Sequence, residues 1–223
     1  MIVYGRNPVA ELVRAGRRRV HHVWATKDPG FPFEPATAQQ LTARAGTEAH
    51  QGIAAEGDPY PYVAEGELLG RDGLLLVLDE VQDPQNLGAI CRTAEVAGAL
   101  GVVIHERGAA EVTPAVCKAS AGAVEHLAIA RVRNIADFLA SAKESGFWAY
   151  GAAAGGRASA FEVEWPERVA LVLGAEGRGL RPRVAKACDE LVSVPMRGRL
   201  DSLNVSATAA VLTYLALQRE FRS

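Results

Sequence analysis

The sequence lacks several features that would place it in a specialised class of proteins. Its longest apolar runs, such as 74–78 and 169–174, are far shorter than the roughly 18 residues that span a membrane. The N-terminus has no signal-peptide pattern, so we expect a cytoplasmic protein. Only three cysteines occur and none forms a CxxC pair, which argues against a disulfide framework and a zinc site. We interpret Cys91, Cys117 and Cys188 as reduced core residues.

The chain also has little excess charge. Its formal net charge is -2 over 223 residues, so no overall basic character indicates a nucleic-acid partner. Two local stretches are nevertheless basic: residues 1–22 hold five arginines against one acid, and residues 178–199 hold six basic residues against two acids. Such stretches fit a surface that contacts phosphate groups, with a merely solvated surface as the alternative.

From residue 74 onward, short apolar runs alternate with segments of helical period. The expected strands span 74–81, 101–105, 126–132, 147–153, 169–174 and 191–195. The expected helices span about 86–99, 113–122, 134–145, 180–188 and 202–221. This alternation predicts an α/β fold with a parallel sheet over 74–223, covered by helices on both faces. Ligands are then expected at the carboxyl ends of the strands.

Residues 1–66 have a different pattern and predict a small αβ domain, followed by a linker at 67–73. A short strand and a helix are expected in "YGRNPVAELVRAG" and a second strand in "VHHVWAT". Another helix is expected in "ATAQQLTARAG", ending at Gly46. The stretch 56–73 contains prolines, glycines and acids that are typical of a connecting segment.

Three loops are expected to leave the carboxyl ends of strands and to converge on one site. In the first, Asp83 and Pro84 turn the chain and Asn86 is placed to cap the next helix. Arg92 follows Asn86 by six residues, so both side chains lie near one helix end, unless Arg92 is only an exposed surface arginine.

The second loop, "VLGAEGRGL", places Glu176 among three glycines. Its GxxGxG spacing differs from the dinucleotide and phosphate-binding fingerprints, so a plain turn and a ligand-binding loop are both open. The third loop follows Pro195 and ends in a polar helix start. Asp201 or Ser202 could cap that helix, and Asn204 adds a polar group beyond what capping requires.

The three loop sequences together carry a family resemblance. "DPQNLGAICRTA", "LVLGAEGRGL" and "VPMRGRLDSLNVS" resemble, in order and spacing, the signature motifs of the SpoU (TrmH-like) family of S-adenosylmethionine-dependent RNA ribose 2′-O-methyltransferases. The resemblance covers about residues 74–220. The N-terminal "YGRNPVAELV" and "HQGIAAE" are similar to the small RNA-binding domain of the RlmB-type subgroup, which methylates a guanosine ribose in large-subunit ribosomal RNA.

The resemblance implies a C-terminal trefoil knot, a homodimer and a cofactor held largely by backbone of the second and third motifs. The implied S-adenosylmethionine-binding residues are Gly174, Val194, Met196 and Leu203. The implied catalytic or substrate-orienting residues are Asn86, Arg92, Glu176, Ser202 and Asn204. For RNA binding, the basic N-terminal stretch and its motif give Arg6, Asn7, Arg17, Arg18 and Arg19. No metal ligands and no membrane partner are expected.

The sequence therefore predicts transfer of a methyl group to a ribose 2′-hydroxyl, in a guanosine of 23S ribosomal RNA. The alternatives are a tRNA substrate and an RNA-binding protein without activity. A dehydrogenase would need a GxGxxG fingerprint, which neither domain has after its first strand. Arg92 is often assigned as the base in this family, but a guanidinium has no acceptor atom. An alternative is that Arg92 binds the adjacent phosphate while the proton passes to phosphate or water.

Overall fold

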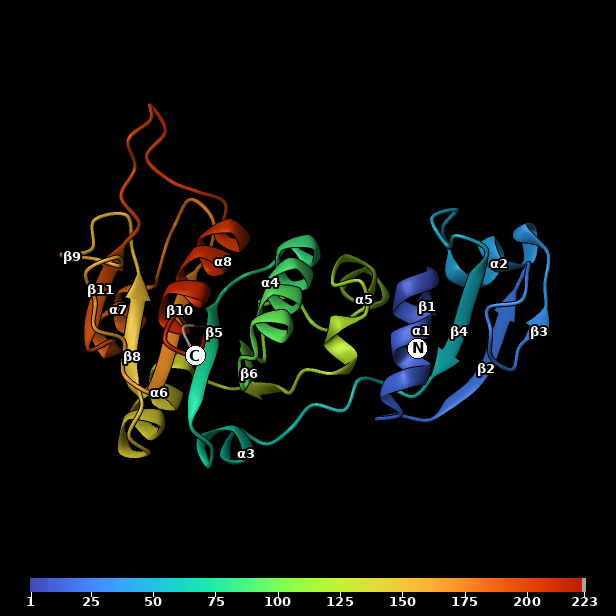
Figure 1. The fold of residues 1–223 in the computed structure, drawn as a ribbon, viewed down its shortest axis with the longest axis horizontal. Helices are drawn as coiled ribbons and strands as arrows, with labels where there is room; N and C mark the ends of the chain where they lie inside the picture. The colour runs from blue at the N-terminus through green and yellow to red at the C-terminus, as the bar shows by residue number, and fades with distance from the viewer. Residues whose placement is uncertain (222–223) are drawn as a thin grey trace.

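The computed structural model describes residues 1–221 and contains two separate β-sheets (Figure 1). The smaller sheet, in residues 1–57, has the strand order β1-β4-β2-β3 and belongs to what we call the N-terminal domain. Its elements are β1 (Ile2–Tyr4), α1 (Arg6–Ala15), β2 (Val20–Ala25), β3 (Glu34–Pro35), α2 (Ala38–Ala45) and β4 (Ile53–Gly57). Both expected helices and both expected strands are present, and two further strands occur: β4 in the centre of the sheet and β3 at its edge.

The two helices of the N-terminal domain cover opposite faces of its sheet. Leu12 of α1 is buried against one face in a cluster that includes Val23. Leu41 of α2 packs with Trp24 on the other face. α2 begins where the sequence predicts, because Thr37 and Gln40 form a reciprocal capping box.

The larger sheet has seven strands in the order β7-β6-β5-β10-β8-β11-β9, and every neighbouring pair is parallel. The predicted parallel α/β fold is therefore confirmed. The strands are β5 (Gly73–Asp79), β6 (Gly101–His105), β7 (Ile129–Val132), β8 (Trp148–Ala152), β9 (Ala158–Ser159), β10 (Arg168–Gly174) and β11 (Glu190–Ser193). The helices are α3 (Glu65–Leu69), α4 (Pro84–Ala97), α5 (Pro114–Ala119), η1 (Ala123–Glu125), α6 (Ile135–Glu144), α7 (Pro182–Ala187) and α8 (Val205–Ala216).

Helices cover both faces of this sheet because alternate side chains of each strand point to opposite sides. In β5, Leu74, Leu76 and Leu78 are buried in a cluster with residues of α4 and α8. Leu75 and Val77 belong to a second cluster with residues of α6 and α7. No helix within residues 1–221 is long and apolar enough to cross a membrane.

Several element boundaries differ from the sequence prediction, among them those of β7, α4 and α8. β7 begins at Ile129 rather than at 126, because the preceding residues form the short helix η1 and a turn. α4 is capped by Asp83, whose carboxylate accepts the amide of Gln85 at 2.9 Å, so Asn86 lies inside the helix. α8 is capped by Asn204 rather than by Asp201 or Ser202.

The segment between the two sheets packs on the large domain. The Val63 amide donates to the Ile129 carbonyl at 3.0 Å, and Leu68 of α3 is buried in the same cluster as Leu75. We therefore describe residues 63–221 as the large domain, and the expected linker at 67–73 includes the end of a packed helix. The trefoil knot stays a prediction that rests on the family resemblance.

Candidate active site

A cavity of about 800 Å³ opens at the carboxyl ends of β10 and β11. Its walls come from the loops that follow β8, β10 and β11 and from the first turns of α8. All four predicted cofactor-binding residues line it: Gly174, Val194, Met196 and Leu203. The structure thus brings these residues together in the place where parallel sheets bind ligands.

Gly174 ends β10 at a point where the backbone folds tightly back on itself. The Gly179 amide donates to the Ala175 carbonyl at 2.9 Å, and Gly177 and Gly179 have positive φ angles of 75° and 68°. A Cβ atom at Gly174 would lie 2.2 Å from the carbonyl carbon of Gly179. The glycines are therefore needed for the turn itself, and this turn forms one wall of the cavity.

An ion pair that the sequence analysis missed anchors this turn to the neighbouring strand. Asp79, at the end of β5, is fully buried and accepts from the Arg181 amide at 2.9 Å and from its Nε at 2.7 Å. Arg181 also reaches Glu80 at 3.3 Å. The sequence offers one signal for this ion pair, an aspartate at the end of an apolar strand. A carboxylate buried at such a position needs a partner.

The side chain of Asn204 joins two of the three motif loops to the start of α8. Its Nδ2 donates to Oδ1 of Asn86 at 3.0 Å and to Oε1 of Glu176. Its Oδ1 accepts from the amide of Ser206 at 2.8 Å and from the Ser206 hydroxyl at 2.6 Å. The amide group is fixed in both orientation and position, so Asn86, Glu176 and Asn204 form one polar cluster, which we call the polar triad.

The remaining two predicted catalytic residues lie apart from this triad. Ser202 lines the cavity, and its hydroxyl donates to Oδ1 of Asp201 at 3.4 Å. Arg92 is exposed on α4 and does not line the cavity; within residues 1–221 its side chain has no hydrogen-bond or ion-pair partner. Arg92 is therefore free to contact a molecule from outside the chain.

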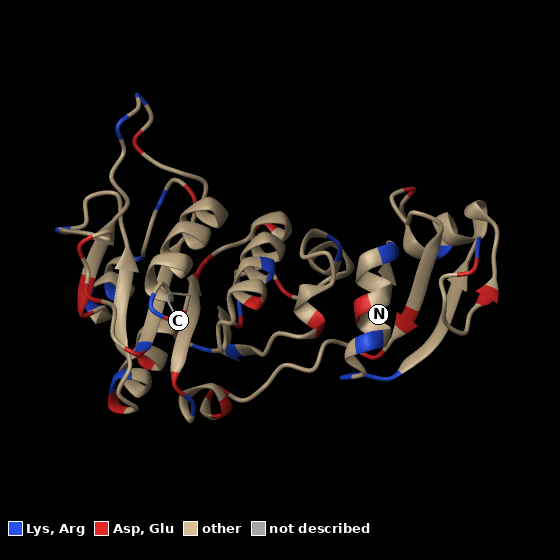
Figure 2. Cartoon of the chain, in the orientation of Figure 1, with Lys and Arg blue, Asp and Glu red and all other residues tan. Residues whose placement is uncertain are grey.

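The predicted RNA-binding residues lie at two different edges of the molecule. Arg6 and Asn7 are exposed at the start of α1, whereas Arg17 and Arg19 are exposed in the turn after it. Figure 1 shows that this turn lies at the lower edge, opposite to the loop between β11 and α8. Figure 2 shows Lys and Arg residues in both segments.

The prediction for Arg18 is wrong. Its side chain is 1% exposed and bonds to Glu125 of the large domain, whose side chain is also 1% exposed. An arginine enclosed in this way cannot reach an RNA backbone. Counting charges in the sequence could not separate Arg18 from its exposed neighbours. An arginine that joins two domains and an arginine that faces solvent look the same in the sequence.

The cysteines are unpaired, as predicted, and chemically quiet. Cys91 and Cys117 are buried, as predicted, whereas Cys188 is only half-buried. Burial raises the pKa of the Cys117 thiol to about 12. A thiol with such a pKa stays protonated at neutral pH and is a poor nucleophile and metal ligand. Within residues 1–221 no group of His, Cys, Asp and Glu residues is arranged to hold a metal ion.

Comparison with known proteins identifies the family. The model of the SpoU rRNA Methylase family matches residues 73–214. The chain belongs to this family. A second model, for RNA 2′-O ribose methyltransferase substrate binding, matches residues 2–63. The protein is thus an RNA methyltransferase of the SpoU family with an N-terminal substrate-binding domain.

Individual relatives match over both domains. A Synechocystis tRNA/rRNA methyltransferase without assigned function is 36% identical over 96% of this chain, which spans only 61% of that protein. The 23S rRNA (guanosine-2′-O-)-methyltransferase RlmB of Pseudomonas syringae is 35% identical over 97% of this chain and 95% of its own length.

Two solved structures have the same fold. A TrmH-family protein from Porphyromonas gingivalis is 30% identical, with a TM-score of 0.79 over 98% of this chain and 89% of its own. The SpoU methyltransferase AviRb from Streptomyces viridochromogenes, solved with its cofactor AdoMet, is 22% identical and has a TM-score of 0.79 over 99% and 90% of the two chains.

The cavity fits the S-adenosylmethionine that this SpoU-family enzyme uses. Apolar side chains of Val194, Met196 and Leu203 line the cavity and suit an adenine ring, and the glycine-rich turn forms one of its walls. The volume lies within the range of small-molecule sites. When bound, the cofactor supplies a methyl group activated on a positively charged sulfur.

Replacing Gly174 with alanine is expected to weaken cofactor binding about tenfold or more. The added methyl group would overlap the backbone of Gly179, and relieving such an overlap typically costs about 1–3 kcal/mol and shifts the wall of the cavity. Titration calorimetry with S-adenosylmethionine measures the change. Gly198→Ala is the matched control, because a Cβ there meets no atom within 4 Å. Equal affinities for the two variants would contradict this account of the turn.

Proposed function

We propose that this SpoU-family enzyme methylates the ribose 2′-hydroxyl of a guanosine in 23S ribosomal RNA. The observation that carries the proposal is the match to an RlmB enzyme over 97% of this chain and 95% of the relative, which includes both domains. The polar triad beside the cavity supports the chemistry. A tRNA substrate remains the alternative, because relatives that match this chain are named for both RNA classes.

In the proposed reaction, the polar triad holds the ribose so that its 2′-hydroxyl points at the methyl group. Glu176 carries acceptor oxygens at the cavity, and Asn204 fixes its carboxylate. Alignment of this kind supplies much of the rate of a transfer between two bound molecules. Ser202, which lines the cavity, would contact the same sugar or the cofactor.

We assign Arg92 to the phosphate next to the methylated ribose. A guanidinium stays protonated and offers only donors, so it suits a phosphate better than a proton. Its exposure and its lack of a partner within residues 1–221 fit this role. The proton of the hydroxyl then passes to Glu176, phosphate or water.

The direct test is transfer of labelled methyl from S-adenosylmethionine to RNA from a strain that lacks the gene. The labelled RNA is separated by size and mapped by 2′-O-methyl-sensitive cleavage. Label at one position of 23S rRNA would support the proposal. Label in tRNA alone would keep the chemistry and overturn the assigned substrate.

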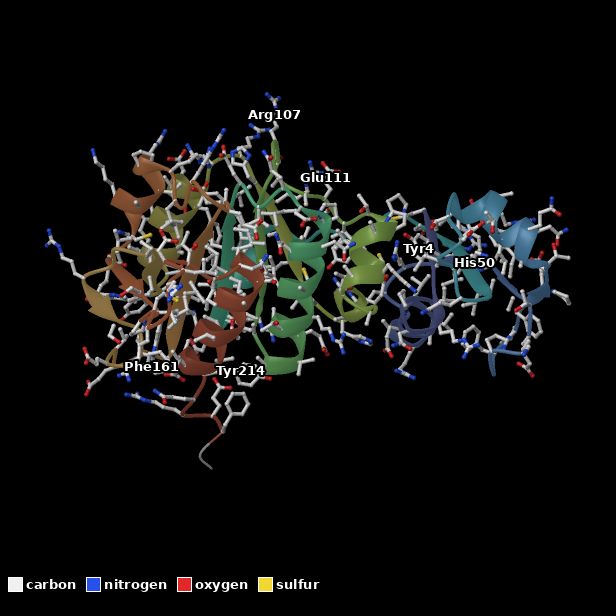
Figure 3. All side chains as sticks on the ribbon, turned by 90° about the horizontal axis from the view of Figure 1, so that it is seen from above. Tyr4, His50, Arg107, Glu111, Phe161 and Tyr214 are labelled. Atoms are coloured by element: carbon white, nitrogen blue, oxygen red, sulfur yellow. The ribbon has the colours of Figure 1, made fainter. Side chains whose placement is uncertain are left out.

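We also propose that two copies associate through α4 and α8. These helices pack against each other and carry exposed apolar side chains: Val96 is 64% exposed and Tyr214 is 45% exposed. Figure 3 shows Tyr214, on α8, at the outer edge of the molecule. Tyr214 also stacks on Phe221, which is 54% exposed, and exposed apolar patches mark association surfaces. Arg92 lies four residues before Val96, on the same side of α4, so this interface would include Arg92.

Tyr214→Glu is expected to convert a dimer into a monomer and to abolish methyl transfer. A carboxylate placed in an apolar interface must lose its hydration, which opposes association. Light scattering measures the mass, and S-adenosylmethionine binding checks that the cavity is intact. Arg219→Glu adds an acid beyond the end of α8 and serves as a control. A monomeric Tyr214→Glu variant with full activity would contradict a need for the dimer.

A further inference from the structure

The junction between the two domains holds two cations at its upper edge. Lys118 lies in the last turn of α5, and its Nζ would be 2.6 Å from a Cβ atom at Gly5. Oε1 of Gln51 approaches the same point to 3.1 Å and also accepts the amide of Arg6 at 3.1 Å. The absence of a side chain at Gly5 therefore makes room for an ammonium group of the other domain at the N-terminus of α1, which Arg6 begins.

Neither cation is neutralised by the protein. Within residues 1–221, the side chains of Lys118 and Arg6 have no hydrogen-bond or ion-pair partner. Burial lowers the pKa of Lys118, and no carboxylate offsets that effect. Lys143, by contrast, is paired with Asp189 at 3.2 Å. A partly desolvated ammonium without a counter-charge is stabilised when an external anion binds next to it.

This junction lies on the same edge of the molecule as the cavity. The Gly5 amide bonds to the Ile53 carbonyl at the start of β4, and Figure 1 shows this end of α1 at the upper edge, where β5 and β8 also end. Figure 3, viewed from that edge, shows Tyr4 next to α5. An RNA strand could therefore reach the cavity and the junction along one side of the protein.

Contacts below the junction hold the two domains in a fixed arrangement. Arg18 and Glu125 are bonded in the interior, and His126 bonds to Glu11 at 2.8 Å. Nη1 of Arg17 donates to the Leu127 carbonyl. The separation between the junction and the cavity is thus set by the protein fold rather than by the RNA.

We propose that Lys118 and Arg6 together bind one phosphodiester group of the substrate RNA at the domain junction. The inference rests on the proposed RNA substrate and adds a residue of the large domain to RNA binding. A phosphodiester fits because it carries one negative charge and oxygen acceptors for both cations. The site then acts as a second anchor at a fixed distance from the methylated ribose.

The test measures RNA affinity against salt concentration, with full-length protein and 23S rRNA from a strain that lacks the gene. Lys118→Ala is expected to lower affinity and to reduce the slope of log K against log salt by about 0.7, the value for one phosphate contact on a single strand. Lys118→Arg should restore most of the slope. Arg71→Ala removes an equal charge from an exposed side chain just before β5, at the strand ends opposite to the cavity, and is the control.

Two measurements keep this inference separate from the proposed function: the salt dependence of RNA affinity in the variants, and the class of RNA that the wild-type protein binds and methylates. If wild-type protein binds 23S rRNA but Lys118→Ala leaves its slope unchanged, the junction site is wrong and the enzyme assignment stands. If Lys118→Ala and Arg71→Ala reduce the slope equally, the effect is one of general charge and the inference also fails. If wild-type protein binds and methylates tRNA but not 23S rRNA, the substrate assignment fails. The same salt series is then measured with tRNA, and it decides whether the junction binds a phosphodiester group. Unchanged thermal unfolding and cofactor binding confirm that the variants are folded.

Discussion

Arg18→Met is expected to destabilise the protein by about 3–5 kcal/mol, because it leaves a carboxylate buried without a cation. Arg18 donates through Nε to Glu125 at 3.1 Å and through Nη1 to the Asp58 carbonyl at 2.7 Å. Both charged side chains are excluded from solvent. The loss would be measured as the free energy of unfolding in urea, followed by circular dichroism and tryptophan fluorescence.

The double variant Arg18→Met, Glu125→Leu separates two contributions to the free energy of unfolding: the destabilisation caused by an unpaired Glu125 and the net stabilisation provided by the ion pair. Removing both charges also removes the desolvation penalty, so most of the lost stability should return. If Arg18→Met alone lowers the free energy of unfolding by less than about 1 kcal/mol, water must reach the Glu125 carboxylate. The double variant has a second use: if its domains stay docked, RNA affinity should be unchanged, since Arg18 does not contact RNA.

The positions of the strands were predictable because buried parallel strands leave a strong pattern. The stretch 101–105 is apolar with flanking breaks, and β6 has those same bounds. The convergence of Asn86 and Asn204, which are 118 residues apart, followed from the rule that loops at the carboxyl ends of parallel strands meet. Neither inference required side-chain detail.

The details that failed depend on contacts between distant segments. Asp83 rather than Asn86 caps α4, since both residues suit a cap and the backbone geometry decides between them. Arg18 looks like part of a basic stretch until Glu125 is known to face it. Arg181 looks like surface charge until Asp79 is known to be buried beside it. In each case the residue type is visible in the sequence, whereas its partner depends on the fold.

Asn204→Asp is expected to lower kcat about 100-fold, the scale of losing one fixed hydrogen-bond donor at a reacting centre. The introduced aspartate keeps Oδ1, so it still caps α8 by accepting the Ser206 amide. It loses Nδ2, which donates to Asn86 and to Glu176. Asn86 can rotate its amide to donate in return, but the Glu176 carboxylate cannot, and two carboxylates then repel each other.

The double variant Glu176→Gln, Asn204→Asp distinguishes two roles for Glu176. The introduced glutamine can donate to the introduced aspartate, so the contact is rebuilt with the donor and acceptor exchanged. Recovery of kcat would mean that Glu176 acts by position, through its contact with Asn204. A kcat that stays low while the KM for RNA, the affinity for S-adenosylmethionine and thermal stability all return to normal would mean that the carboxylate itself takes part in the reaction. Because the 2′-hydroxyl must lose a proton during methyl transfer, Glu176 would then be its acceptor rather than phosphate or water.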